Sequence, residues 1–239
     1  MGNERGFSVL ETLISLTIFF FIVLGTLECF LNARSHFLEM KHKHETNQAA
    51  LSALDKIKTD VSRSGKGLLT LSQLEVLKSI TCENNILCIK TNDLEFTSPS
   101  SLIQGQTRIF FNDPRQLKKK QKLAFFDSQK GEVKEISSVG SQSCILSTSL
   151  SHSYEKDQAH IVLLREIRFY LDKKKDILRR KVNSSPAQPL LEKTSDFLCS
   201  YDEMTNLVQI RIIIKNKKEI EHDANIFPKN TALSRFFPK

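Results

Sequence analysis

The sequence lacks the short motifs that mark many enzymes. It has no Gly-x-Ser-x-Gly nucleophile elbow, no His-Glu-x-x-His pair, no P-loop and no dinucleotide glycine fingerprint. With eight glycines in 239 residues, it also has little of the glycine-rich loop that cradles phosphate groups. We therefore expect a protein that is not an enzyme and that uses no cofactor.

Metal-ligand spacing is also missing. The five cysteines include no Cys-x-x-Cys pair, and none lies beside a histidine at zinc-finger spacing. His42 and His44 are two positions apart on an expected helix, so their side chains point to different faces. We expect no metal site.

Proline first occurs at Pro99, and charge is scarce near the N-terminus. Between Phe7 and Leu31 the charged residues are Glu11 and Glu28 alone. About 20 apolar residues are enough for a helix to cross a hydrocarbon core of roughly 30 Å, so this stretch predicts a transmembrane helix. An acid inside such a helix costs roughly 2.5–3.5 kcal/mol on insertion scales, which makes Glu11 a candidate functional residue.

A glycine-aromatic junction precedes the apolar run. Residues 5–7 read Arg-Gly-Phe, so cleavage after Gly6 would release six residues and leave the hydrophobic segment on the mature chain. An ordinary secretory signal has its cleavage site on the far side of the apolar segment. An uncleaved signal anchor is the alternative interpretation of the same stretch.

This segment resembles the N-terminus of type IV prepilins and type II secretion pseudopilins. There a short leader ends in Arg/Lys-Gly, Phe begins the mature chain and a glutamate is its fifth residue, positions that Gly6, Phe7 and Glu11 match. The resemblance implies a leader peptide at residues 1–6, cleavage by a prepilin peptidase and N-methylation of Phe7. It also implies that Glu11 meets the N-terminal amine of a neighbouring subunit, which neutralises two charges that are costly to bury alone.

A helical pattern continues beyond the membrane-length segment, with apolar residues at steps of three and four or their multiples. These residues are Phe37, Met40, Leu51, Leu54, Ile57 and Val61. We expect a transmembrane helix over residues 7–31, an amphipathic continuation over 32–64, and a stop at Gly65 and Gly67. Many major pilins carry a proline near mature position 22, where this chain has Glu28.

From Ile86 onward the hydrophobic period changes to two, which is typical of strands. The expected strands are residues 86–90, 108–111, 122–126, 133–136, 144–148, 161–171, 177–182, 197–201 and 207–214. The last four form two antiparallel hairpins around polar turns. We expect residues 65–239 to be one β-rich domain, with the amphipathic half of the helix covering its antiparallel sheet, in an α+β fold.

The C-terminal hairpins resemble those of large minor pilins and pseudopilins, the W-type and J-type subunits. The shared order is a hairpin with Tyr170 and Arg179-Arg180, a link with two prolines, and a β-branched strand. Residues 53–61, ALDKIKTDV, also resemble the end of their long helix. The resemblance implies a pilin-like fold and a filament subunit near the tip of a type IV pilus or type II secretion pseudopilus, where it helps to initiate assembly.

The same resemblance implies the compartment and the partners. We expect a single-pass protein of the bacterial inner membrane, with its N-terminus in the cytoplasm and its β-rich domain in the periplasm or outside the cell. The expected partners are other pilin or pseudopilin subunits, the prepilin peptidase and the lipid of the inner membrane.

Cys29 lies in the membrane segment, which leaves Cys82, Cys88, Cys144 and Cys199. An even number of cysteines in a domain that faces an oxidising compartment predicts disulfides, and four cysteines allow three connectivities. We favour Cys82–Cys88 closing a short loop and Cys144–Cys199 joining distant strands. Reduced, buried thiols are the alternative.

The formal net charge of +8 suits a nucleic acid, an anionic lipid surface or an acidic partner. The densest run, residues 118–122, is not interleaved with the aromatics that stack single strands, so we interpret it as a solvated face. Two other functions remain open. One is a signal-anchored periplasmic binding module or enzyme that never polymerises, and the other is a competence-type minor pilin whose positive domain binds DNA.

Overall fold

The structure is a computed structural model that describes residues 9–111, 113–215 and 219–236. It divides the chain into two compact units, Met1–Ala49 and Ala50–Lys239. Helix α1 (Val9–Ser62) begins in the first unit and ends in the second. The remaining helices, α2 (Leu69–Gln73) and α3 (Lys229–Phe236), belong to the second unit with all of the strands.

The first unit consists of the apolar part of α1. An 18-residue window of this helix has a mean hydropathy of 2.2 and is entirely exposed. Two threonine hydroxyls of this segment bond within the helix: Thr17 Oγ1 donates to the Leu13 carbonyl at 2.7 Å and Thr26 Oγ1 to the Val23 carbonyl at 2.9 Å. The expected apolar helix of membrane-spanning length is confirmed, and it is the one such helix among the described residues.

The part of α1 that belongs to the second unit has one buried stripe. The buried residues are Ala50, Ala53, Leu54, Ile57, Asp60 and Val61. The sequence pattern assigned three further residues to the same stripe, but they are exposed: Leu51 in this unit, and Phe37 and Met40 in the first unit. The helix ends at Ser62, and Gly65 and Gly67 follow with φ of +71° and +69°, so the predicted glycine stop is confirmed.

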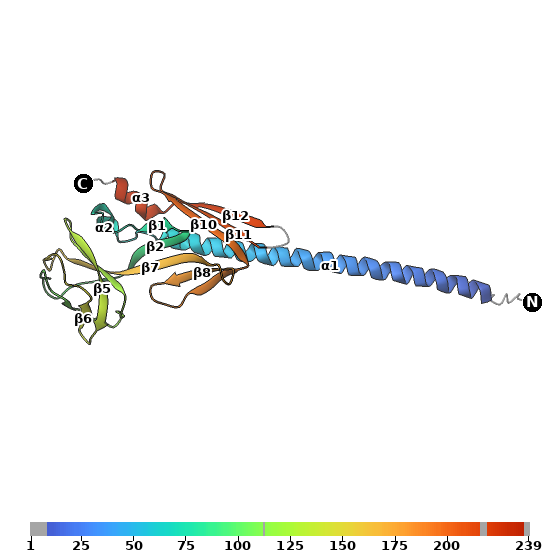
Figure 1. The fold of residues 1–239 in the computed structure, drawn as a ribbon, viewed down its shortest axis with the longest axis horizontal. Coiled ribbons are helices and arrows are strands. Elements are labelled where there is room, and N and C mark those ends of the chain that lie inside the picture. The colour runs from blue at the N-terminus through green and yellow to red at the C-terminus, as the bar shows by residue number, and fades with distance from the viewer. Residues whose placement is uncertain (1–8, 112, 216–218, 237–239) are drawn as a thin grey trace, which may run out of the picture. The chain divides into compact units, whose positions relative to one another are not determined.

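A nine-stranded antiparallel sheet makes up most of the second unit (Figure 1). Its strands are β1 (Ile80–Glu83), β2 (Ile86–Phe96), β3 (Arg108–Phe110), β4 (Lys122–Phe126), β5 (Gly131–Val139), β6 (Ser143–Leu146), β7 (His160–Asp172), β8 (Ile177–Val182) and β9 (Gln188–Glu192). The main order is β1-β2-β7-β4-β5-β6-β3. Strand β7 has β2 along one side, while its other side pairs first with β4 and then with β8, which in turn pairs with β9.

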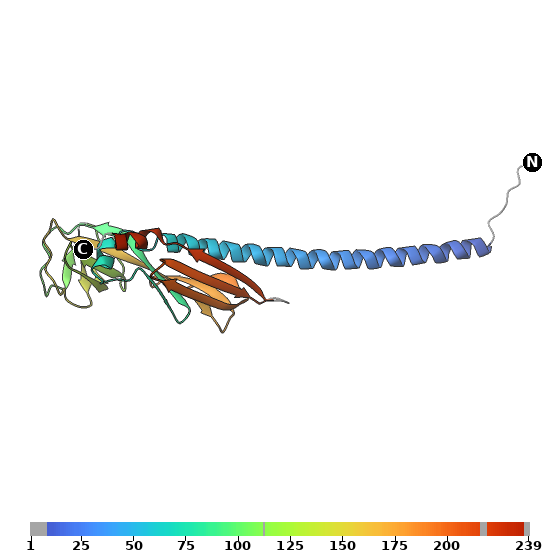
Figure 2. The ribbon, with the colours of Figure 1, turned by 90° about the horizontal axis from the view of Figure 1, so that it is seen from above.

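A separate three-stranded antiparallel sheet has the order β10-β11-β12, and Figure 2 shows its strands side by side. These strands are β10 (Thr194–Asp202), β11 (Leu207–Ile214) and β12 (Ile220–Ile226). All nine expected strands are present, and β1, β9 and β12 were not expected. Strand β9 contains Pro189, and most residues of β12 are polar, so neither has the apolar pattern of a central strand.

One core cluster joins the end of α1 to both sheets. Ile57 of α1, Phe169 of β7, Phe197 of β10 and Ile212 of β11 are all fully buried in it. The prediction that the long helix covers an antiparallel sheet is confirmed for its C-terminal part, and the fold is of the α+β class.

Two further clusters lie against the first half of β7. Ile161 and Leu163 face one cluster, whereas Val162 and Leu164 face the other. The sequence pattern predicted one apolar face for this strand, but its first half is buried on both faces. The second face is covered by α2 and the segment around it, including Leu68 and Leu71.

Candidate functional site

Glu11 lies in the first turn of α1, where a negative charge is favoured by the helix dipole. Its helical neighbours Leu10, Leu13 and Ile14 are all more than half exposed. The Glu11 carboxylate makes no hydrogen bond or ion pair with any residue in the described part of the chain. Within the described residues, the arrangement is therefore an acid without a partner on an uncovered apolar helix surface. Gly6 and Phe7, the other two predicted processing and assembly positions, lie outside the described residues.

A buried ion pair connects the end of α1 to the nine-stranded sheet. Arg180 Nε on β8 donates to Asp60 Oδ2 on α1 at 2.7 Å, and the two side chains are only 9% and 4% exposed. Arg179, the preceding residue, instead bonds Asp172 across the β7–β8 hairpin at 2.9 Å. Asp60 and Arg180 both belong to segments that carry the sequence resemblance, and the structure brings them together in a structural role.

A second buried network centres on Glu132 of β5. Its carboxylate accepts from the backbone N–H groups of Ser151 and His152 at 2.8 and 3.1 Å and from the Tyr154 hydroxyl at 3.1 Å. The Lys134 ammonium lies 2.9 Å from the same carboxylate. The network fixes the segment after β6 onto β5. No sequence motif predicts this network, because Ser151, His152 and Tyr154 lie about 20 residues away from Glu132.

The pKa values in this network do not suit acid–base catalysis at neutral pH. Burial alone would raise the pKa of Glu132, but the bonds from Ser151, Lys134 and His152 outweigh it, so the pKa lies below its usual value. Burial and the neighbouring Glu132 carboxylate raise the pKa of Tyr154. Each group is therefore held in one protonation state near pH 7, whereas a general acid or base needs a pKa near the working pH.

The Glu132→Gln variant is expected to be about 1–3 kcal/mol less stable at pH 7, because hydrogen bonds to a charged carboxylate are lost. A lowered folded-state pKa stabilises the fold above the ordinary value of 4.5, and this contribution is lost as the pH falls through the folded value. The stability gap between wild type and variant should therefore shrink below pH 4.5. Urea unfolding of the full chain in detergent at several pH values measures it. Exposed Glu135→Gln is the control, and an equal gap at pH 7 and pH 3 would contradict the assignment.

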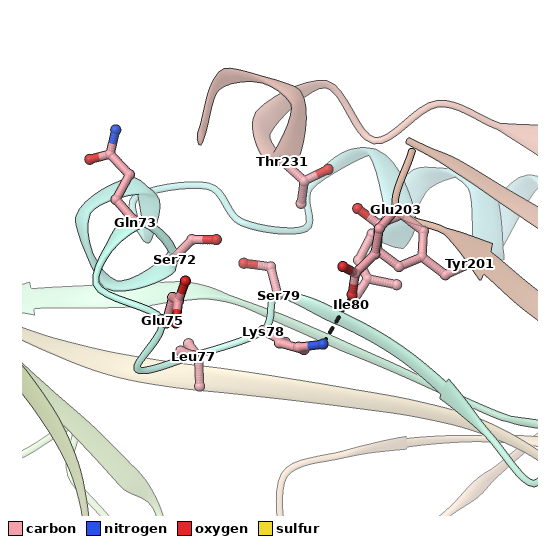
Figure 3. Close-up of a pocket in the computed structure, with 10 residues that line it drawn as sticks. All are labelled: Ser72, Gln73, Glu75, Leu77, Lys78, Ser79, Ile80, Tyr201, Glu203 and Thr231. Atoms are coloured by element: carbon pink, nitrogen blue, oxygen red, sulfur yellow. Dashed lines mark hydrogen bonds and ion pairs between the residues drawn. The ribbon is translucent and has the colours of Figure 1, made fainter. Parts of the chain in front are cut away.

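An open polar cavity of about 630 Å³ lies between the segment around α2, the start of β1 and the turn after β10, as Figure 3 shows. Lys78 Nζ and Glu203 Oε1 pair across it at 3.0 Å, but their side chains are 72% and 59% exposed. The Tyr201 and Thr231 hydroxyls both donate to Asn206 Oδ1 at 2.8 Å. The polar groups here hold the fold together, and the lining contains no cysteine or histidine nucleophile or base.

A basic cavity of about 360 Å³ contains part of the predicted solvated run. Lys120, Lys122, Arg168 and Lys181 line it together with Glu166. Burial would raise the pKa of Glu166, but Lys122, at 3.1 Å, and Arg168 outweigh it and hold the pKa below its usual range. Two of the four cations are thus already paired with an internal carboxylate.

The predicted disulfide pairs are not brought together, and the cysteines of the described chain are free thiols. Cys82 lies opposite Leu87 and Cys88 lies opposite Thr81 in the β1–β2 ladder, so these two thiols point to opposite faces of the sheet. Cys144 is buried in the core cluster of β3–β6, whereas Cys199 borders the cluster of α1. The exposed Cys29 lies on α1. The thiols of Cys82 and Cys199 influence each other, so that the pKa of Cys82 is raised and that of Cys199 is lowered.

No group of three or more metal-ligating side chains occurs among the residues that the structure describes. No profile of a known protein family matches the chain, and no curated protein sequence matches it. One solved structure, the Gp54 tailspike of Acinetobacter baumannii bacteriophage AP22 in complex with A. baumannii capsular saccharide, is 18% identical with a TM-score of 0.29. The match covers 32% of this chain and 15% of the tailspike chain. A likeness this short and loose does not define the fold.

Proposed function

We propose that this chain is a minor pilin or pseudopilin of the W/J type. It is a non-enzymatic filament subunit near the tip of a type IV pilus or type II secretion pseudopilus, where it helps other subunits to begin assembly. The observation that carries the proposal is the position of Glu11, an acid without a partner among the described residues, in the first turn of a 54-residue helix whose N-terminal apolar residues are uncovered.

The exposed apolar surface of α1 supports the proposal because it is suited to two apolar environments, one after the other. In the bilayer it contacts lipid, and in a filament it packs against the same segment of neighbouring subunits. Glu11 then supplies the one strong polar contact of that interface. After cleavage behind Gly6, the new amine of Phe7 is a cation close to the membrane surface, and pairing it with a neighbour's Glu11 neutralises both groups.

The helix end and the β-rich unit support the same proposal. The end of α1 is attached firmly to its sheets by the Asp60–Arg180 ion pair and by the apolar stripe from Ala50 to Val61. A subunit that is pulled from the membrane by its helix needs such a joint between helix and domain. The two units thus correspond to a membrane or filament part and a displayed part.

Duplex DNA binding by the positive domain is a weaker candidate. The basic cavity has the right sign of charge, but Glu166 already pairs with Lys122 and Arg168. DNA affinity depends on cations that are free to replace counterions at phosphates. The internal pairing therefore argues against this cavity as a phosphate-backbone site.

Mass spectrometry of the N-terminus tests the proposal directly. In cells that contain a prepilin peptidase, we expect the mature chain to begin at Phe7 with a methylated amine. A Gly6→Leu variant is the matched control, and it should retain residues 1–6 because the residue before the cut no longer fits. Wild-type chains that keep Met1 would contradict the proposal and support the uncleaved signal anchor.

A further inference from the structure

Strands β1 and β10 lie against each other without sharing a ladder. Strand β1 is at the edge of the nine-stranded sheet and β10 is at the edge of the three-stranded sheet, and the two strands are in contact (Figure 1). The described ladders contain no backbone pairing between the two sheets. Among the described residues, side chains connect the two sheets at this junction.

One cysteine from each edge strand points into the junction. Cys82 is directly opposite the buried Leu87, and Cys199 is directly opposite the buried Ile210. Cross-strand partners share a face of their sheet, so both thiols face the core cluster that contains Leu87 and Ile210. Both border that cluster on strands that contact each other, both are only partly buried, and each thiol shifts the pKa of the other.

We propose that Cys82 and Cys199 form a redox pair that closes into a disulfide joining the two sheets, while Cys88 and Cys144 remain thiols. Cys82 and Cys199 are far apart in the sequence, so the bridge closes a long loop of the unfolded chain. Long loops gain the most stability from a cross-link in the chain-entropy account. The bridge would hold the β10–β12 sheet to the rest of the domain under load.

The two remaining cysteines of the domain are held elsewhere. Cys88 points to the opposite face of β2 from Leu87, where its thiol bonds Arg168, and burial raises its pKa. Cys144 is fully buried in a different core cluster, and burial raises its pKa to about 11. Neither thiol faces another cysteine, and neither forms a thiolate readily at neutral pH.

The bridge forms by two exchange steps with a donor disulfide. The neighbouring Cys82 thiol lowers the pKa of Cys199, so the Cys199 thiolate attacks one donor sulfur, forms a mixed disulfide and displaces the first donor thiolate. Cys82 then loses its proton to the displaced thiolate and attacks the Cys199 sulfur, which releases the second donor sulfur as a thiolate. The two cysteines are oxidised by two electrons, and the donor disulfide is reduced to two thiols.

The donor is a small-molecule or protein disulfide of an oxidising compartment. Exposure to such a donor in the cell rests on the proposed function, which places this domain outside the cytoplasm. The ability of the two thiols to pair does not depend on that location. The pairing can therefore be tested with purified protein and oxidised glutathione.

The full chain, purified reduced in detergent, is incubated with oxidised glutathione, alkylated, digested and analysed by mass spectrometry. We expect a linked peptide pair that contains Cys82 and Cys199, with Cys88 and Cys144 alkylated. Dithiothreitol should lower the Tm of the oxidised chain by about 10 °C. Alkylated Cys82 and Cys199, or a linkage to Cys88 or Cys144, would overturn the proposal.

Two variants and one cellular measurement complete the test. Cys199→Ser should leave Cys82 alkylated and abolish the effect of dithiothreitol on Tm, whereas Cys88→Ser should keep both the linked peptide and the effect. Rapid alkylation of intact cells reports the pair in its own compartment. If the bridge forms in purified protein but both thiols are alkylated in cells, the pairing stands and the extracytoplasmic location of the proposed function fails.

Discussion

Replacing Asp60 by alanine is expected to destabilise the folded domain by about 3–5 kcal/mol, because it leaves the Arg180 guanidinium buried without its partner. The two side chains meet at 2.7 Å and are 4% and 9% exposed. Water therefore cannot replace the lost carboxylate without opening the contact between α1 and β8. The loss should appear as a lower urea midpoint of the full chain in detergent, followed by circular dichroism.

Charge compensation can be separated from packing by removing both charges. In the double variant Asp60→Leu with Arg180→Met, no buried charge is left alone, and we expect much of the stability to return. Glu203→Ala is the control for an exposed ion pair, and it should cost less than about 1 kcal/mol. If Asp60→Ala costs no more than Glu203→Ala, the buried pair does not hold the helix to the sheet.

The pattern of apolar residues predicted most of the elements because local periodicity reports which faces are buried. The step from period 3.6 to period two after Gly67 separates the helix from the strands, and the polar turns 172–176 and 202–206 mark the two C-terminal hairpins. Asp176 and Asn206 take positive φ in these turns, which their residue types tolerate. The residues that make up each of these signals lie close together in the sequence, so the signals can be recognised without knowledge of the fold.

Contacts between distant segments could not be predicted in the same way. Asp60 and Arg180 each lie in a segment that carries the resemblance, but the sequence contains nothing that pairs them across 120 positions. The sequence-based prediction of the disulfide pairs is wrong for the same reason. Cys82 and Cys88 are close in sequence, yet strand alternation turns them to opposite faces, and only the packing of β1 on β10 reveals Cys199 as the neighbour of Cys82.

The apolar run 161–164 shows a third limit. Alternation predicts a strand with one buried face, but these four residues are all buried because α2 covers the second face. A continuous apolar run in a strand indicates burial on both sides. The segment that supplies the second cover, residues 68–77, has too short a helix to be recognised by its period.

The Glu11→Ala variant is expected to enter the membrane and lose its leader as wild type does, but to be incorporated into filaments roughly tenfold less or worse. The reason is that the Phe7 amine of the neighbouring subunit would be left in an apolar interface without a counter-ion, and 1.36 kcal/mol is enough for a tenfold change. Removing an acid from an apolar helix favours membrane insertion. If the helix were a simple signal anchor, the variant would therefore insert into the membrane better than wild type, not worse. The filament-subunit proposal predicts a loss and the simple anchor predicts a gain, so this variant distinguishes the two.

The measurement is the ratio of processed subunit in sheared filaments to processed subunit in membranes, by quantitative mass spectrometry. Glu11→Asp keeps the charge and should retain part of the incorporation, with the shorter side chain reaching the amine less well. Glu28→Ala removes one acid from the far end of the same exposed stretch of α1 and is the matched control, with incorporation close to wild type. Equal loss in Glu11→Ala and Glu28→Ala would show that total helix charge, and not a specific pair at Glu11, governs assembly. Wild-type incorporation of Glu11→Ala would remove the pairing altogether.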